Sequence, residues 1–348
     1  MESLLREWDG ESVIFRFDRQ ANTWIFIAIH STRLGPAIGG TRMKPYPNLQ
    51  AALKDALRLA AGMTYKWAAA GFEAGGGKAV IAIPHDLDPE ARRELLRRYG
   101  AFVHNHKGLF LTGPDLGTSS EDMDIIAEFG DPYIFARTPG AGGAGNPGPF
   151  TALGVFTSIQ VVVERLFGDS SLVGKRIMIQ GVGSVGRELI ELLRKAGAEV
   201  VFSDVDEASV EHFCDELGLQ CYPPDEVYES PCDIFAPCAV GGVLDEKTIP
   251  RLRCRAVAGA ANNQLANPED ALRLRERGIL YAPDFIANSG GAIAIIGMET
   301  RSWSRKEAEK KVTETIKDNL SQVFELAELE KVDTDEAARR LAHQRLGA

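Results

Sequence analysis

Apolar residues recur with two different periods in the first part of the chain, and each period predicts its own kind of element. Residues 13–18 and 24–30 are rich in aromatic and β-branched side chains, which predicts two strands joined by a turn. Between 49 and 70 the apolar residues lie three or four positions apart, as on one face of a helix, and Asn48 is a candidate N-cap. Further elements are expected, namely strands over 78–83 and 108–115 and a helix over 88–106.

The second half alternates short apolar runs with amphipathic helical stretches. A Gly/Pro-rich break at 137–149 cannot form a helix or a strand and marks a loop or hinge. The helix expected at 151–167 is followed by strands and helices in alternation, which is typical of a doubly wound parallel sheet. The expected strands are 176–180, 198–204, 232–239, 256–261 and 279–286, and the chain from Ser304 onward is expected to be helical.

Composition narrows the classes of protein to which the chain can belong. The net charge is −10, which argues against a nucleic acid or an anionic membrane as partner. The five cysteines never form a C-x-x-C pair, so we expect reduced thiols in the cytoplasm and no metal site. The N-terminus is polar and acidic, which predicts no signal peptide, and no apolar run approaches the roughly 18 residues of a membrane helix.

A glycine fingerprint follows the first strand of the second half. Gly181, Gly183 and Gly186 have G-x-G-x-x-G spacing, with an apolar strand before them and an amphipathic helix after them. In this motif the glycines provide a tight turn, close approach to a pyrophosphate, and close packing of helix on strand. Asp204 ends the next strand and is expected to accept a hydrogen bond from a ribose 2′-hydroxyl. Because no Arg or Lys follows it closely, the sequence favours NAD over NADP; a Rossmann-shaped domain without a cofactor is the alternative.

The stretch “GFEAGGGKAVIAIP” places three glycines before Lys78. It is not a phosphate-binding P-loop, because the first glycine of that motif would fall on Phe72 and its Ser/Thr on Ala79. A second lysine, Lys66, lies near the end of the preceding helix, and two neighbouring lysines lower each other's pKa. One could hold a carboxylate while the other acts as a base. From spacing alone, however, a lysine is usually a solvated charge, and the third candidate, Asp115, could simply cap a helix.

Nine ordered blocks resemble the glutamate/leucine/phenylalanine/valine dehydrogenase family over nearly the whole chain. They are “LGPAIGGTRM”, “ALRLAAGMTYK”, “GGGKAVI”, “TGPDLGT”, “TALGVF”, “QGVGSVG”, “DIFAPCAVGG”, “AGAANNQLA” and “LYAPDFIANSGGAI”. The resemblance implies NAD-dependent oxidative deamination of an L-amino acid to a 2-oxo acid, ammonia and NADH, reversible as reductive amination. It also implies that Lys66 binds the substrate α-carboxylate, that Lys78 activates the catalytic water, and that Asp115 passes protons to and from the substrate nitrogen.

Further binding residues follow from the same resemblance and from the glycine loop. Those expected to contact the substrate are Ile38, Gly39, Gly40, Met63, Lys66, Asn262 and Asn288. Those expected to contact the cofactor are Thr151, Gly181, Val182, Gly183, Ser184, Val185, Gly186, Asp204, Cys238, Ala239, Ala260 and Asn262.

The expected architecture is an α/β protein of two domains separated by a deep cleft. Residues 1–149 would form an α/β domain for substrate binding, catalysis and oligomerisation, and 150–325 a Rossmann-type, doubly wound NAD-binding domain. Residues 326–348 are expected to be a C-terminal helical segment that packs back on the first domain. The resemblance and an apolar pair of strands with exposed edges also predict a homo-oligomer.

Position 38 bears on the side chain of the substrate. Glutamate-specific members of the family carry a lysine immediately before the Gly-Gly pair, where this chain has Ile38. A second substrate carboxylate would find no cation there, so a hydrophobic amino acid is expected. Phenylalanine is slightly favoured, with leucine and valine close behind, because discrimination among apolar side chains is worth only about 1–3 kcal/mol. A catalytically inactive NAD-binding regulatory protein of the same fold and a dehydrogenase for a non-amino substrate are the alternatives.

Overall fold

The protein, described by a computed structural model over residues 2–347, divides by its backbone contacts into two compact units. The first unit comprises the chain up to Asn146, Ile295–Ser302 and the residues from Ala342 onward. The second unit comprises Pro147–Ala294 and Trp303–Leu341. The first crossing between the units, after Asn146, lies inside the Gly/Pro-rich stretch 137–149.

A five-stranded mixed sheet forms the centre of the first unit. Its strands are β1 (Ser12–Asp18), β2 (Thr23–Ser31), β3 (Ala37–Lys44), β4 (Gly75–Ala82) and β5 (Phe110–Pro114). They lie in the order β1-β2-β4-β3-β5; β2 pairs antiparallel with β1 and β4, whereas β3 pairs parallel with β4 and β5. Side chains alternate across each strand, so β2 directs Phe26 to one face of the sheet and Ile27 to the other.

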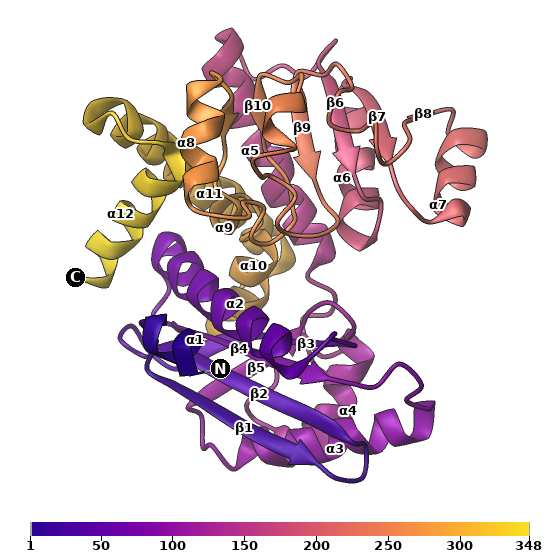
Figure 1. Cartoon of the computed structure of the whole chain (residues 1–348), viewed down its shortest axis with the longest axis vertical. Helices are drawn as coiled ribbons and strands as arrows, with labels where there is room; N and C mark the ends of the chain where they lie inside the picture. Colours follow the sequence, from indigo (N-terminus) through magenta and orange to yellow (C-terminus); the bar gives the residue numbers. More distant parts are fainter. Residues whose placement is uncertain (1, 348) are drawn as a thin grey trace. The chain divides into compact units, whose positions relative to one another are not determined.

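Helices cover both faces of this sheet (Figure 1). They are α1 (Glu2–Glu7), α2 (Leu49–Ala70), α3 (Pro89–His104) and α4 (Ser120–Gly130), followed by the 3-10 turn η1 (Pro139–Ala141). α2 packs on β2 and β4 through an apolar stripe that includes Leu53 and Leu57. α3 and α4 pack on each other over the opposite face and bury Tyr99. Asn48 caps α2 as expected, because its side chain accepts a hydrogen bond from the amide of Ala51 at 2.9 Å.

Two stretches of this sheet differ from the expectation. β4 begins at Gly75 rather than Lys78, so the three glycines belong to a strand and not to a loop. The sequence pattern does not predict β3, because its two glycines and its cations break the apolar alternation that marks a strand. Glycine is required in β4 for space, since a Cβ on Gly76 would overlap the backbone and hydroxyl of Thr64 on α2.

The second unit is built on a six-stranded parallel sheet, which confirms the doubly wound prediction. Its strands are β6 (Arg176–Gln180), β7 (Glu199–Ser203), β8 (Gln220–Cys221), β9 (Ile234–Pro237), β10 (Ala256–Val257) and β11 (Leu280–Tyr281). Their order is β11-β10-β9-β6-β7-β8, and the pairs are parallel. The order of addition reverses between β6 and β9, and sheets of this kind bind ligands at such a switch point.

The helices that lie wholly in the second unit (Figure 1) are α5 (Gly148–Phe167), α6 (Ser184–Lys195), α7 (Glu207–Glu211), α8 (Glu269–Glu276), α9 (Asp284–Ala287) and α11 (Arg305–Glu330), with the short π and 3-10 segments η2 (His212–Glu216) and η3 (Ile249–Arg251). Two helices, α10 (Gly290–Arg301) and α12 (Thr334–Leu346), begin in the second unit and end in the first, which they enter at Ile295 and Ala342. The strand expected over 279–286 is therefore short, because its second part forms α9.

The expectation that no apolar run approaches the length of a membrane helix is wrong. α5 has 20 residues and is long and apolar enough to span a membrane by length and composition. Its apolar side chains are those of a core helix, because Val155, Ile159 and Val162 are fully buried and the helix packs against α6 and α11. The apolar character of α5 is thus explained by its position inside the second unit.

Candidate active site

β4 and β5 bring Lys78 and Asp115 together in the first unit. Lys78 lies on β4 opposite Ala28 of β2 and is only 3% exposed. Asp115 directly follows β5. The Lys78 Nζ is 2.9 Å from the Asp115 Oδ1, so two of the residues expected to carry the chemistry form a buried ion pair.

Burial and the neighbouring charges together leave the pKa values of both groups lowered. Burial lowers the pKa of the Lys78 amine; Asp115 opposes this, and the Arg42 guanidinium lowers the pKa further. Burial by itself would raise the pKa of the Asp115 carboxyl, but Lys78 and Arg42 outweigh it and hold that pKa below its usual range. Lys78 can therefore lose its proton at a lower pH than a free lysine while Asp115 stays charged.

Arg42 is a charged member of the site that the sequence analysis missed. It lies on β3 two residues after Gly40, so both positions are on the same face of the strand. Its Nε donates to the Asp115 Oδ2 at 2.7 Å, and its Nη1 donates to the Asp55 Oδ2 at 3.0 Å. The Tyr46 hydroxyl donates to the same oxygen of Asp55 at 2.7 Å. The period-two spacing from Gly40 within “GGTRM” was the available signal.

Glycines leave the space in which this cluster forms. A Cβ on Gly40 would lie 2.8 Å from the Asp115 Cβ and 3.3 Å from the Lys78 Nζ. A Cβ on Gly39 would overlap the carbonyl of Gly77. Neither position can carry a side chain, because atoms of β4 and of the end of β5 fill the space that it would need.

Three further predicted substrate residues come from α2 and β3. Lys66 lies on α2 and is 8% exposed. Its neighbour Trp67 donates from Nε1 to the backbone oxygen of Ile38 at 2.9 Å, which fastens α2 to β3. The Met63 Cγ lies 3.4 Å from the position that a Cβ of Gly39 would occupy. The contacting roles expected of these residues stay predictions.

The expected cofactor residues of the second unit gather at the carboxyl ends of its strands. Gly181 follows β6 and donates from its amide to the Ser203 oxygen at the end of β7, at 2.8 Å. Cys238 follows β9 and donates from its amide to the Gln180 oxygen at the end of β6, at 2.7 Å. Burial raises the pKa of the Cys238 thiol to about 12, so it is uncharged at neutral pH. The carboxyl ends of parallel strands are where open α/β sheets bind ligands.

Each glycine of the fingerprint has the geometry that a dinucleotide loop requires. Gly181 has φ +97°, and a Cβ there would lie 2.6 Å from the Cβ of Ala239. A Cβ on Gly186 would overlap the carbonyl of Gly181, so α6 packs directly on the loop. Apart from its chain neighbours, no atom of residues 2–347 lies within 4 Å of a Cβ on Gly183, which leaves that side of the loop open. α6 begins at Ser184 without a side-chain cap, so its first amides fit a phosphate.

Asp204 is tied to the glycine loop. Its Oδ2 accepts from the amide of Val182 at 2.6 Å, and its Oδ1 accepts from the amide of Asp206 at 2.9 Å. Each oxygen has a second lone pair, so these bonds are compatible with the predicted ribose contact. Arg187, which the sequence analysis did not consider, donates to the Val182 oxygen at 2.9 Å and to the Ser209 hydroxyl at 2.8 Å. Arg187 lies on α6, before Asp204 in the sequence, so the residues that follow Asp204 do not reveal it.

Asn262 and Asn288 are in direct contact. The Asn288 Nδ2 donates to the Asn262 Oδ1 at 2.8 Å and to the Ala260 oxygen at 3.0 Å. Within residues 2–347 the buried Asn288 Oδ1 has no hydrogen-bond partner, so it can accept a bond from a bound molecule. Thr151 lies in the first turn of α5, and its hydroxyl donates to the Pro147 oxygen at 3.1 Å. Val185, the remaining loop residue, lies in the first turn of α6.

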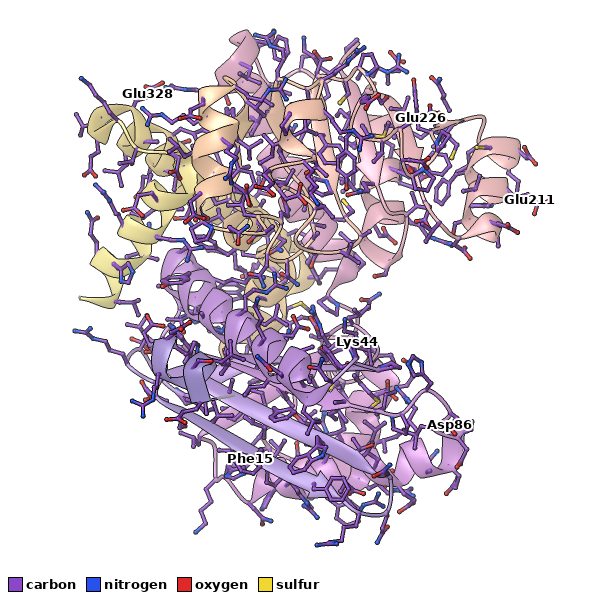
Figure 2. The ribbon with its side chains drawn as sticks, in the orientation of Figure 1. Phe15, Lys44, Asp86, Glu211, Glu226 and Glu328 are labelled. Carbon is purple, nitrogen blue, oxygen red and sulfur yellow. The ribbon has the colours of Figure 1, made fainter. Side chains whose placement is uncertain are left out.

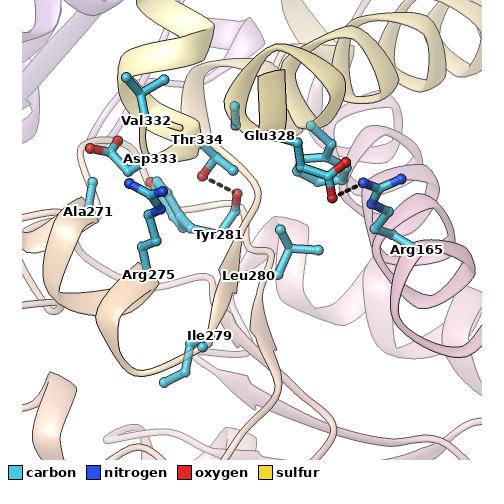
Figure 3. Close-up of a pocket in the computed structure, with 13 residues that line it drawn as sticks. Arg165, Ala271, Arg275, Ile279, Leu280, Tyr281, Glu328, Val332, Asp333 and Thr334 are labelled. Carbon is cyan, nitrogen blue, oxygen red and sulfur yellow. Dashed lines mark hydrogen bonds and ion pairs between the residues drawn. The ribbon is translucent and has the colours of Figure 1, made fainter. Parts of the chain in front are cut away.

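A separate cavity of about 420 Å³ in the second unit does not coincide with these residues (Figure 3). Residues of α5, α8, β11, α11 and the turn before α12 line it. Two pairs of its lining residues interact with each other: the Thr334 hydroxyl donates to the Tyr281 oxygen at 2.7 Å, and Arg165 forms an ion pair with Glu328. No residue singled out from the sequence lines the cavity, so it is a gap between packed elements and not the predicted site.

Both units match models of one protein family. Residues 17–129 match the family described as Glu/Leu/Phe/Val dehydrogenase, dimerisation domain. Residues 142–210 and 204–348 match the family described as Glutamate/Leucine/Phenylalanine/Valine dehydrogenase.

Named relatives resemble the chain over nearly its full length. Leucine dehydrogenase of Geobacillus stearothermophilus is 41% identical over 342 residues, which cover 98% of this chain and 92% of that protein. Phenylalanine dehydrogenase of Lysinibacillus sphaericus is 42% identical over 335 residues, which cover 95% of this chain and 87% of that protein. The crystal structure of L-tryptophan dehydrogenase from Nostoc punctiforme superposes with a TM-score of 0.79 at 40% identity, covering 100% of this chain and 98% of that one.

Proposed function

The chain belongs to the Glutamate/Leucine/Phenylalanine/Valine dehydrogenase family and is an amino acid dehydrogenase of the NAD(P)-dependent kind, and we propose that its substrate is a hydrophobic L-amino acid and its cofactor NAD. Such an enzyme oxidatively deaminates the substrate to a 2-oxo acid and ammonia. Phenylalanine is the substrate that we expect to be used best, with leucine and valine close behind.

The observation that carries this proposal is the buried ion pair of Lys78 and Asp115, with 2.9 Å between Nζ and Oδ1. A buried amine with a lowered pKa suits a general base. The carboxylate beside it is charged, and Lys78 is a main cause of its lowered pKa, so it accepts a proton more readily once Lys78 is neutral. These two groups provide the proton transfers that oxidative deamination requires.

The protons and bonds of the proposed reaction can be assigned to groups of the site. The substrate nitrogen first loses a proton through Asp115. The α-carbon then loses its hydrogen as a hydride, which bound NAD would accept, and the C–N bond becomes an iminium. Water adds to the iminium carbon while neutral Lys78 takes a proton from the water. This proton passes from Lys78 through Asp115 to the nitrogen. The hydroxyl proton then goes to Lys78 as the C–N bond breaks, so that the carbonyl forms and ammonia leaves. Lys66 holds the substrate α-carboxylate throughout, because a carboxylate at a buried site needs a permanent cation.

Support for NAD over NADP comes from the end of β7. A negatively charged Asp204 would repel a 2′-phosphate, whereas it can accept a hydrogen bond from a 2′-hydroxyl. The nearby cation Arg187 is already engaged with the Val182 oxygen and the Ser209 hydroxyl. We therefore expect NAD to be preferred.

Support for a hydrophobic substrate comes from the residues around Gly39 and Gly40. Ile38 is half-buried, and Met63 lies beside Gly39. Both side chains are apolar, so a second substrate carboxylate next to them would be desolvated without compensation. The named relatives act on leucine, phenylalanine and tryptophan, which agrees with this substrate class.

A substrate panel with steady-state kinetics tests the proposal. We expect NADH formation with phenylalanine, leucine and valine, and a kcat/KM for glutamate at least about 10²-fold lower, because burying an unpaired carboxylate costs several kcal/mol. The Lys78→Ala variant serves as the control for contaminating activity. Highest kcat/KM with glutamate would refute the substrate class. No NADH with any amino acid would favour the inactive regulatory alternative.

The assembly and location are proposals as well. We propose a homo-oligomer, because the first unit matches a dimerisation domain and β1 is an edge strand. β1 exposes Phe15 (65%) and Phe17 (36%); Phe15 is labelled in Figure 2. We also propose the cytoplasm as its location, since the five cysteines are free thiols.

A further inference from the structure

A chain of alternating charges continues from the catalytic pair to α2. Lys78 contacts one oxygen of Asp115, and Arg42 contacts the other at 2.7 Å. Arg42 also reaches Asp55, which accepts from the Tyr46 hydroxyl at 2.7 Å. The side chains of Arg42, Asp55 and Asp115 are only 12–13% exposed. Charges this far from solvent are costly unless each one has a defined partner.

Arg42 contacts two carboxylates of the site and no substrate atom in the proposed reaction. We propose that Arg42 is a positioning residue: its guanidinium holds Asp115 through Oδ2, so that Oδ1 faces Lys78 and the carboxylate stays charged when Lys78 gives up its proton. Asp55 in turn fixes the guanidinium from α2. This inference rests on the proposed roles of Lys78 and Asp115.

The geometry explains why an arginine stands here. Nε and Nη1 point to two different carboxylates, and a planar guanidinium can make both bonds at once. An ammonium group is a point charge and would reproduce the charge without the two fixed directions. Arg42 also keeps its charge at every pH at which the enzyme works, unlike the groups that it holds.

The charged groups on the elements packed around Lys78 determine whether a substitution raises or lowers the pKa of Lys78. Arg42 on β3 lowers the pKa of Lys78, whereas Asp115 after β5 and Asp55 on α2 raise it. Lys66 also lies on α2, and His30 on β2 bonds to Asp9 and Thr64. Removal of the Arg42 charge should therefore make Lys78 harder to deprotonate, and removal of the Asp55 charge should make it easier.

Two variants that should shift the pKa of Lys78 in opposite directions test the proposal. For Arg42→Gln the rising limb of log kcat/KM against pH should move to higher pH by about one unit or more. Arg42 and Lys78 contact the two oxygens of one carboxylate, and a neighbouring charge shifts a pKa by about that amount. For Asp55→Asn the limb should move down. Arg42→Lys should return the limb toward its original pH while kcat stays low, because it restores the charge and not the geometry. A purely structural role would move none of these limbs.

Arg58→Gln is the matched control. Arg58 is 40% exposed and contacts the other oxygen of Asp55 at 3.3 Å, so its charge is screened by water and its loss should leave the limb in place. KM for NAD should be unchanged in all four variants.

A second measurement separates this proposal from the proposed function. Competitive labelling of amines with acetic anhydride at a series of pH values, with mass spectrometry of the Lys78 peptide, reports the protonation of Lys78 without turnover. The labelling midpoint should rise in Arg42→Gln and fall in Asp55→Asn. Equal midpoints in the original protein and in these variants would overturn the role of Arg42, even if the enzyme deaminates amino acids. If Arg42→Gln does not fold, the direction found for Asp55→Asn decides. If no amino acid reduces NAD, the proposed function fails while the labelling still tests Arg42.

Discussion

A methyl group at position 40 should disable the site without touching a charged residue. In Gly40→Ala the new Cβ would lie 2.8 Å from the Asp115 Cβ and 2.8 Å from the Pro114 oxygen. Carbon atoms in contact prefer about 3.5–4.0 Å, so Asp115 or the end of β5 must move by about 0.7 Å or more. β5 pairs with β3 in register at this point, Gly40 opposite Gly113, so the strands cannot separate without loss of hydrogen bonds.

The size of the effect follows from the distances that the displacement changes. The two bonds of Asp115, at 2.9 Å to Lys78 and 2.7 Å to Arg42, would lengthen beyond the range of a good hydrogen bond. Misplacement of catalytic groups by about 1 Å can cost about 10²-fold in rate. Overpacking a tight site costs about 1–3 kcal/mol of stability. We therefore expect kcat/KM to fall about 10²-fold and the melting temperature to decrease by several degrees.

Gly71→Ala is the matched control for this experiment. Gly71 ends α2 with φ +69°, and in the described part of the chain no atom beyond its two neighbours lies within 4 Å of a Cβ there. An alanine forced into this left-handed conformation costs about 1–2 kcal/mol, so stability should fall while kcat stays close to the original. NADH formation with phenylalanine and thermal unfolding are measured for both variants. The reasoning is refuted if Gly40→Ala keeps its kcat/KM, or if both variants lose activity in the same proportion.

Three further predictions concern the base, the cofactor and the assembly. Lys78→Ala should lose about 10²–10⁴-fold in kcat while binding substrate, whereas Lys66→Ala should mainly raise KM; identical defects in steady-state kinetics would contradict the two roles. Asp204→Ala should reduce the preference for NAD over NADP by about tenfold or more, because a charged acceptor is lost and the Arg187 cation stays; an unchanged ratio of turnover numbers would sink the assignment. Light scattering should give an oligomer, and Phe15→Glu on β1 should dissociate it, whereas a stable monomer at working concentration would exclude the expected pairing.

Elements with a regular period and clear ends could be predicted closely. α2 runs over Leu49–Ala70 as its apolar spacing predicts, because Asn48 caps its start and Gly71 ends it in a left-handed conformation. The parallel sheet of the second unit is likewise confirmed from its alternation of strands and helices. β3 could not be predicted, because its glycines are chosen for close backbone contact rather than for strand propensity.

The residues of the candidate site could be predicted more easily than the contacts between them. Resemblance pointed to Lys78 and Asp115, but the contact of Arg42 with Asp115 depends on β3 lying between β4 and β5 in the sheet. Because the sequence pattern does not predict β3, it also does not predict which residues lie next to Arg42. Arg187 was missed for a similar reason, since it is close to Ser209 in space and not in sequence. Local patterns do not contain such distant contacts.

The glycine-lined strands also restrict how this enzyme could be altered in the laboratory or in evolution. Positions 39, 40 and 76 cannot gain a side chain, because backbone atoms or side-chain atoms of neighbouring elements already fill that space. A library of variants designed to change the substrate range should therefore leave these three positions unchanged. Ile38 and Met63 already carry side chains, so their volume and shape can be varied without displacing a strand. Most of the freedom to acquire a new substrate therefore lies at a few apolar positions beside a framework that tolerates almost no change.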